Sequence, residues 1–405
     1  MTTENLVSPL IAADARWVRK LPRRVTLVAL VLTLIAVQFS IATSQILFSL
    51  ALVSWVTTLV VERRLPSAPP WILPLVLYAA WSLVSAAFAP DLRASLQECK
   101  QLVLLLLIPL TYEIVDEGAV MPLTTLVLAA GAASALVGIG QFSILHYDDL
   151  GQRPRSTLGL YMTFSGLMML TLNLAVARVL FGTKARMWPA IVVPALAVVL
   201  PLSLARNAWV GAGFSVALLL AMRDWRLTAV VPAAAAAFFV AAPAQILRRF
   251  YSIFDLNDLS RRDRFAMARA GFRIIREHPM TGVGPNMIER VYAQYREPEA
   301  VLRNPPHLHN VPLQIAAERG LPALALWVWF VVAIVIAAMR LYRQAPREGS
   351  LRFLSATALA SVVAMLGAGM FEHNFGDSEF QMLFLVLITL PFAVARTDRS
   401  RVERP

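Results

Sequence analysis

Long apolar stretches recur along the whole chain, and they constrain its fold more than any other feature. A helix needs about 18–20 predominantly apolar residues to cross the hydrocarbon core of a membrane. We therefore predict an all-α polytopic membrane protein with about twelve transmembrane helices. These are expected near residues 24–41, 45–61, 71–89, 98–115, 121–145, 156–181, 187–204, 207–222, 226–246, 320–341, 352–371 and 379–396.

The composition excludes the main alternatives to a membrane protein. Hydrophobic residues make up 58% of the 405 positions, charged residues only 15%, and the mean hydropathy is +0.64. A soluble domain is nearer to about 45–50% apolar and about 25% charged, and it could not bury this much apolar surface. Intrinsic disorder is excluded by the same figures. A disulfide scaffold is excluded because the chain has one cysteine, Cys99.

Basic residues beside the apolar stretches predict the orientation of the chain. The N-terminal segment carries Arg16, Arg19 and Lys20, whereas the short connections 42–44 and 372–378 contain no Lys or Arg. Both termini are therefore predicted to be cytoplasmic. The first apolar stretch is interpreted as a retained anchor, because no small-residue cleavage site follows it. We expect one membrane domain over residues 1–405.

The longest connection, residues 247–319, is predicted to lie outside the cytoplasm and to carry part of the active site. Apolar residues at helical spacing predict a helix from Arg264 to Glu277. The glycines that follow, within residues 281–285, indicate a tight turn. A second helix is expected from about Asn286 to Tyr295.

The segment 304–312 is the most informative polar region. Asn310 can cap a helix and Pro312 fits its first turn. His309 would then lie just before the helix N-terminus, whose partial positive charge disfavours a charged imidazolium. A neutral imidazole can act as a general base. A surface or capping histidine fits the same residues, and so does a metal pair with His307, although no nearby acid has a recognised ligand spacing.

Arginines supply the other candidate site residues. Arg206 is the only charge in a very short connection between two apolar stretches, and charge near membrane depth tends to be functional or paired. Arg264 begins the predicted loop helix, and the planar guanidinium suits phosphate. Arg153, Arg155 and Arg261 are candidates for an assisting role, as is Asn310. An arginine at the membrane interface or at a solvated helix end is the alternative in each case.

Three of these patterns together resemble a known family. The run from Arg264 to Pro285, with its His-Pro and Thr-Gly-Val-Gly-Pro elements, resembles the loop of the lipopolysaccharide O-antigen ligases. His309-Asn310, nine residues and then Gly320 match the histidine pattern of that family. Arg206, three residues before a tryptophan, resembles its other arginine site.

The resemblance implies a GT-C-like bundle at the periplasmic face of a bacterial inner membrane. It further implies inverting transfer of O-antigen polysaccharide from undecaprenyl pyrophosphate to a sugar hydroxyl of lipid A–core. His309 would take the proton of that hydroxyl, while Arg206 and Arg264 would hold the pyrophosphate. Beyond these substrates and membrane lipids we expect no nucleic-acid partner, no cofactor and no metal.

Other functions share part of this evidence. O-antigen polymerases and protein O-oligosaccharyltransferases have most of the same features. A transporter should place ionisable groups near mid-membrane and often has paired halves with broken helices. Here the charges inside the apolar stretches, such as Glu113 and Arg178, lie near their ends, which favours the transferase.

Overall fold

The computed structural model describes residues 21–149, 151–183, 186–252, 259–298 and 300–402. Every regular element within these ranges is a helix, so the predicted all-α class is confirmed for them. Arg16, Arg19 and Lys20, which entered the orientation argument, lie outside the described residues. The chain is a multi-pass membrane protein.

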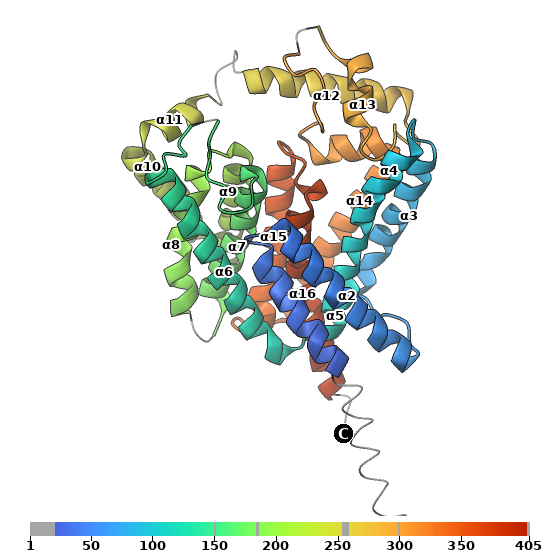
Figure 1. Cartoon of the computed structure of the whole chain (residues 1–405). Helices are drawn as coiled ribbons and strands as arrows, with labels where there is room; N and C mark the ends of the chain where they lie inside the picture. The colour runs from blue at the N-terminus through green and yellow to red at the C-terminus, as the bar shows by residue number, and fades with distance from the viewer. Residues whose placement is uncertain (1–20, 150, 184–185, 253–258, 299, 403–405) are drawn as a thin grey trace, which may run out of the picture.

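The helices follow one another with short connections in most places (Figure 1). After a helical segment over residues 21–36 come α2 (Ile41–Glu62), η1 (Pro70–Ile72), α3 (Leu73–Ala87), α4 (Leu92–Glu98), η2 (Cys99–Leu106), α5 (Leu107–Ile114), α6 (Glu117–Ser143), α7 (Tyr161–Phe181) and α8 (Met187–Leu202). The second half comprises α9 (Arg206–Arg223), η3 (Trp225–Ala229), α10 (Val230–Ala241), α11 (Ala244–Tyr251), α12 (Leu259–Glu277), α13 (Ile288–Tyr295), α14 (Val311–Gln344), α15 (Ser350–Gly369), η4 (Asn374–Gly376) and α16 (Ser378–Val402).

Each of the twelve predicted stretches overlaps with helix, although helix begins only at Tyr161 within 156–181 and is interrupted between Ala241 and Ala244 within 226–246. The number of helices that cross the membrane stays a prediction. Eight helical segments among the described residues are long and apolar enough to span. Two further predicted spans correspond to shorter apolar helices, at Met187–Leu202 and Trp225–Phe238. The helical segment at the predicted stretch 98–115 begins earlier than expected. It runs continuously over Leu92–Ile114, with a 3₁₀ helix in its middle.

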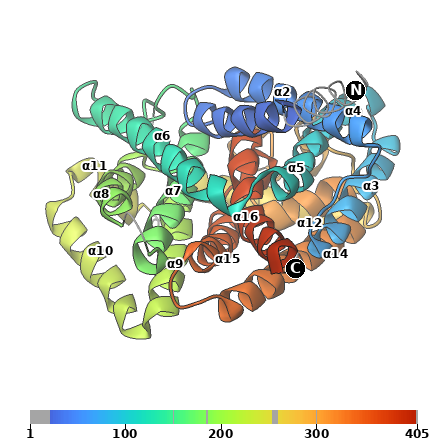
Figure 2. The ribbon, with the colours of Figure 1, turned by 90° about the horizontal axis from the view of Figure 1, so that it is seen from below.

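Burial separates the core helices from those on the outside. Of the apolar windows of α7, α15 and α16, 83%, 72% and 83% are buried, against 33% for α2 and α14. Seen from below, α15 and α16 lie near the middle of the bundle, and α2, α3, α10 and α14 lie around it (Figure 2). We infer that this outer set presents its exposed apolar side chains to lipid.

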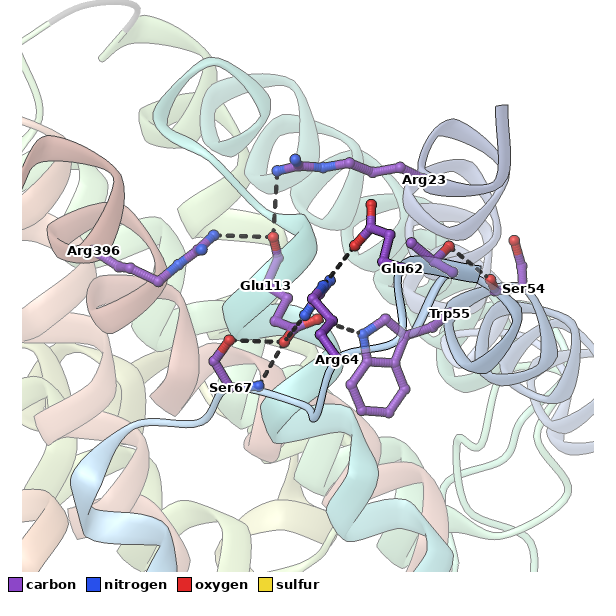
Figure 3. A network of polar contacts seen from close by, with 9 residues as sticks. Arg23, Ser54, Trp55, Glu62, Arg64, Ser67, Glu113 and Arg396 are labelled. Carbon is purple, nitrogen blue, oxygen red and sulfur yellow. Dashed lines mark hydrogen bonds and ion pairs between the residues drawn. The ribbon is translucent and has the colours of Figure 1, made fainter. Parts of the chain in front are cut away.

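A buried carboxylate joins several segments at the end of the bundle where α16 finishes. Glu113 at the end of α5 is only 4% exposed. Its side-chain oxygens accept hydrogen bonds from the Arg64 guanidinium (2.7 Å), the Trp55 indole (2.9 Å) and the Ser67 hydroxyl (2.8 Å) (Figure 3). Its backbone carbonyl accepts from Arg396 at 3.0 Å. The carboxylate therefore joins α5 to α2 and to the connection after α2, and the backbone carbonyl of the same residue joins α5 to α16.

The opposite end of the bundle carries the predicted loop. Both loop helices form close to where they were expected, because α12 ends at Glu277 as predicted and begins five residues earlier, and α13 begins two residues later. In Figure 1, α12 and α13 lie across the top of the bundle, above the start of α14. The candidate site lies beneath α12.

Candidate active site

The helix that leads away from the site, α14, is capped at its start and broken after nine residues. The Asn310 side chain accepts a hydrogen bond from the Leu313 amide at 2.9 Å, and Pro312 occupies the first turn, so the predicted cap is confirmed. The break comes at Gly320, whose φ is 80°. A Cβ at this position would lie 1.9 Å from the Met280 carbonyl oxygen. Only glycine fits there without movement of the backbone.

The glycine-rich turn over residues 278–285 is the partner of this break. The backbone amides of Val283 and Gly284 donate to the carbonyl oxygens of Ala317 and Glu318, at 3.0 and 2.8 Å. These carbonyls belong to the last turn before the break, where helical partners are lost. The turn therefore fastens α12 to the first part of α14, the helical segment that begins two residues after His309.

His309 is held by an acid that comes from a different part of the chain. Its Nδ1 lies 2.9 Å from Oε2 of Glu372, in the connection after α15. Glu372 is 5% exposed, and its other oxygen accepts from the His373 amide at 3.0 Å. Burial alone would raise the pKa of Glu372, but the His309 hydrogen bond and the nearby imidazoles outweigh it and lower the pKa to about 2.

The backbone of His309 has an unusual conformation. Its φ of 50° is in the left-handed region, which a side chain other than glycine adopts at a cost of about 1–3 kcal/mol. The surrounding contacts maintain it, among them the hydrogen bond from the Asn310 side-chain amide to the Met370 carbonyl at 3.0 Å. A strained histidine beside a buried carboxylate is typical of a functional site.

His307 lies next to the same carboxylate. Its Nε2 is 3.5 Å from Oε1 of Glu372, and its ring centroid is 4.2 Å from that of His309. Burial lowers the pKa of His307 to about 4, because it disfavours the charged imidazolium more than Glu372 favours it. The ring is therefore neutral at pH 7.

A cavity of about 610 Å³ lies between α12, the start of α9 and the start of α14. Most of its walls are apolar, including Phe265 and Phe272 of α12 and Leu321 of α14. Six polar side chains line it. One is Asn207, and the other five are candidate site residues from the sequence: Arg206, Arg261, Arg264, His309 and Asn310. Residues more than a hundred positions apart are thus brought to one space.

The arginines reach this cavity from two helices. Arg206 is the first residue of α9, and its guanidinium donates to the Ser252 hydroxyl at the end of α11, at 3.1 Å. Arg261 and Arg264 lie one turn apart near the start of α12 and are partly buried, whereas Arg262 between them is exposed and does not line the cavity. Helical periodicity therefore selects two arginines of this cluster.

Arg153 and Arg155 do not line this cavity. The Arg153 guanidinium lies over the ring of Tyr161, 4.1 Å from its centroid. Tyr161 lines an adjoining cavity of about 370 Å³ together with Glu372, so Arg153 lies next to this second cavity rather than in the first. Arg155 is exposed and donates to the Gly159 carbonyl at 3.3 Å, within its own loop.

Sequence reasoning missed Glu372, which lies 63 positions from His309. One signal was present, because the connection 372–378 contains acids and a histidine but no Lys or Arg. Nothing in its spacing pointed to His309. The pairing depends on how α14 and α15 pack.

Comparison with known families finds a match in the middle of the chain. Residues 190–328 match the family model described as O-antigen ligase. This segment of the chain is therefore similar to the O-antigen ligase family. No curated protein matches the chain.

The matched segment contains most of the site. It runs from α8 into the membrane part of α14 and includes Arg206, Arg264, His309 and the break at Gly320. Glu372 lies outside the matched residues and reaches this segment through its contact with His309. The site is therefore completed by the connection between α15 and α16.

Proposed function

We propose that this protein is a membrane glycosyltransferase that moves O-antigen polysaccharide from undecaprenyl pyrophosphate to a sugar hydroxyl of lipid A–core. The observation that carries the proposal is the cavity shared by Arg206, Arg264 and His309. A prenyl-linked sugar pyrophosphate has matching chemistry. Its diphosphate suits the guanidinium groups, and its hydrocarbon chain suits the apolar walls around Phe265 and Phe272.

His309 is the general base of the proposed reaction. A carboxylate can only accept a hydrogen bond, so Nδ1 of His309 donates to Glu372, and in the neutral imidazole that acts as base Nε2 keeps its lone pair. Nε2 takes the proton of the acceptor hydroxyl as the hydroxyl oxygen bonds to the anomeric carbon. The imidazolium that results is stabilised by Glu372, which is a positioning residue because it acts through His309. A positioned base of this kind contributes about 10²–10⁴-fold in rate.

Arg206 and Arg264 act on the leaving group. As the new bond forms, the bond between the anomeric carbon and the pyrophosphate oxygen breaks, and the electron pair remains with the pyrophosphate. Guanidinium groups placed beforehand beside this oxygen stabilise the charge that develops there. A single displacement inverts the anomeric carbon. Arg261 lines the same cavity and is proposed to assist.

We place this reaction at the periplasmic face of a bacterial inner membrane, with both termini cytoplasmic. The support is the positive-inside pattern of the sequence. Arg262 is an exposed residue of α12, and Arg347 is an exposed residue between α14 and α15. In this orientation Arg262 lies on the periplasmic side of the membrane and Arg347 on the cytoplasmic side. In a Cys99→Ser background, a membrane-impermeant maleimide should label Arg262→Cys and not Arg347→Cys in intact cells. The reverse labelling would refute the orientation.

Transfer by purified protein tests the proposed function. The protein in detergent, stripped with EDTA, is given an undecaprenyl-pyrophosphate glycan and lipid A–core, and the glycolipid mobility shift is followed. We expect transfer by the unmodified chain and a loss of about 10²–10⁴-fold in His309→Ala. His146→Ala is the matched control, because His146 is exposed and outside the site. It should retain full activity.

Three other results would change the assignment or the mechanism. Polymerised donor without modified acceptor would make the protein a polymerase that uses the same site. Full activity of His309→Ala would remove the histidine from the mechanism. If no glycan moves under any condition, the transferase proposal fails.

A further inference from the structure

His307, His309 and Glu372 bring three potential metal-binding side chains together. One ligand atom from each residue lies within 4.8 Å of the others. The sequence offered only the two histidines, and the missing third ligand was the reason to expect no metal there. The connection after α15 supplies that ligand, since Glu372 is 2.9 Å from Nδ1 of His309 and 3.5 Å from Nε2 of His307.

The chemistry of this set fits a transition-metal ion. Two imidazoles and one carboxylate with a fourth position open to water form a common zinc arrangement. Four-coordinate Zn²⁺ takes nitrogen and oxygen ligands at about 2.0–2.2 Å, which separates neighbouring ligand atoms by about 3.4 Å. The two carboxylate oxygens of Glu372 lie near this distance from the histidines, with Oε2 2.9 Å from His309 Nδ1 and Oε1 3.5 Å from His307 Nε2. Because one ligand atom from each residue lies within 4.8 Å of the others, side-chain rotations that draw the three atoms together would close them around one ion.

An ion can reach this position from the cavities on both sides. His309 lines the 610 Å³ cavity, whereas His307 and Glu372 line the adjoining cavity of about 370 Å³. Asn207 lines both of them, so the three ligands form part of the wall between the two spaces. A water molecule from either side can complete the coordination.

We propose that His307, His309 and Glu372 form an inhibitory site for Zn²⁺ or a similar divalent transition-metal ion. The ion takes the lone pair of His309 Nδ1 in place of the proton that Nδ1 donates to Glu372. The proton stays on the ring and moves to Nε2, so Nε2 becomes a donor and no longer accepts the proton of the acceptor hydroxyl. The binding stands on the three side chains alone, and the inhibition rests on the proposed function.

Binding is tested first, without any activity measurement. Co²⁺ is titrated into EDTA-stripped protein in detergent, and visible absorption reports coordination by nitrogen and oxygen ligands. We expect one Co²⁺ per chain, displaced by Zn²⁺, and an affinity at least about tenfold weaker in His307→Gln and in Glu372→Gln. His146→Gln is the control and should bind as the unmodified chain does. Absence of binding, or binding that survives both substitutions, would overturn the proposal.

Inhibition is tested in the transfer assay. Zn²⁺ should stop transfer by the unmodified chain, EDTA should restore it, and His307→Gln should need at least about tenfold more Zn²⁺. Zn²⁺ that binds at these residues but leaves transfer unchanged, or accelerates it, would overturn the inhibitory role. If the chain transfers no glycan at all, the proposed function fails, while the Co²⁺ titration still decides whether the metal site exists.

Discussion

Two buried glutamates at opposite ends of the bundle show how similar groups serve different purposes. Glu113 is 4% exposed and Glu372 is 5% exposed. The Glu113 carboxylate is surrounded by donors, since an arginine, an indole, a hydroxyl and a backbone amide all reach it. Glu372 has two histidines and one backbone amide, and it lines a cavity.

The difference separates structural from functional burial. A carboxylate with a full set of fixed donors stabilises the packing of the segments that carry them, and removing it leaves several donors unpaired. When a carboxylate is paired with imidazoles beside a cavity, the strength of its hydrogen bond to an imidazole changes as that ring gains or loses a proton. The partners of a buried acid, rather than its burial, therefore indicate its role in this molecule.

After His309→Ala, the largest effect at the cavity end of the bundle should come from its arginines. Arg264→Ala removes a cation beside the proposed leaving group, and we expect a loss of about 10²–10³-fold in the transfer rate. Arg262→Ala is the matched control two residues away on α12, since its side chain is exposed and does not line the cavity. Equal losses in the two variants would show that general charge, rather than position, matters.

The break in α14 should give the next largest effect. In Gly320→Ala the new Cβ meets the Met280 carbonyl and φ stays positive, so we expect a loss of at least about 1–3 kcal/mol in stability. Because the break positions His309, the transfer rate should fall as well. Gly140→Ala in α6, where a Cβ meets nothing within 4 Å, is the control for thermal unfolding in detergent. A fully stable and active Gly320→Ala would mean that the turn over residues 278–285 does not position the site.

Local signals explain what the sequence could predict. The end of α12 and the cap at Asn310 depend on neighbouring residues, and their patterns are visible in the chain. Gly320 was named only through the resemblance to a family, because its role depends on the distant Met280 carbonyl. The gathering of Arg206, Arg264 and His309 was accessible only through the resemblance to a family. The selection of Arg261 over Arg262 follows from the face of α12 that meets the cavity, which spacing alone does not specify.

Long-range packing explains what the sequence could not predict. Glu372 meets His309 because the end of α15 lies beside the start of α14, a contact between segments with no shared motif. The same holds for Glu113, whose donors come from α2, from the connection after it and, at its carbonyl, from α16. Both glutamates stand close to the end of an apolar stretch in the sequence, so their positions along the chain do not distinguish them.

The most direct test of this distinction compares Glu372→Gln with Glu113→Gln. Each substitution replaces a carboxylate by an amide of nearly the same size. At Glu113 the amide weakens or loses hydrogen bonds to a charged group, worth about 1.5–3 kcal/mol each, whereas at Glu372 the amide oxygen can still accept from Nδ1 of His309. The transfer rate and the thermal unfolding temperature are measured for both variants in the same detergent. We expect Glu372→Gln to lose about 10- to 100-fold in rate while its unfolding temperature changes little. Glu113→Gln should unfold at a lower temperature and keep its rate below that temperature. A Glu372→Gln variant with an unchanged rate, or a Glu113→Gln variant that loses rate without losing stability, would contradict the assignment of catalysis to the His309 end of the bundle.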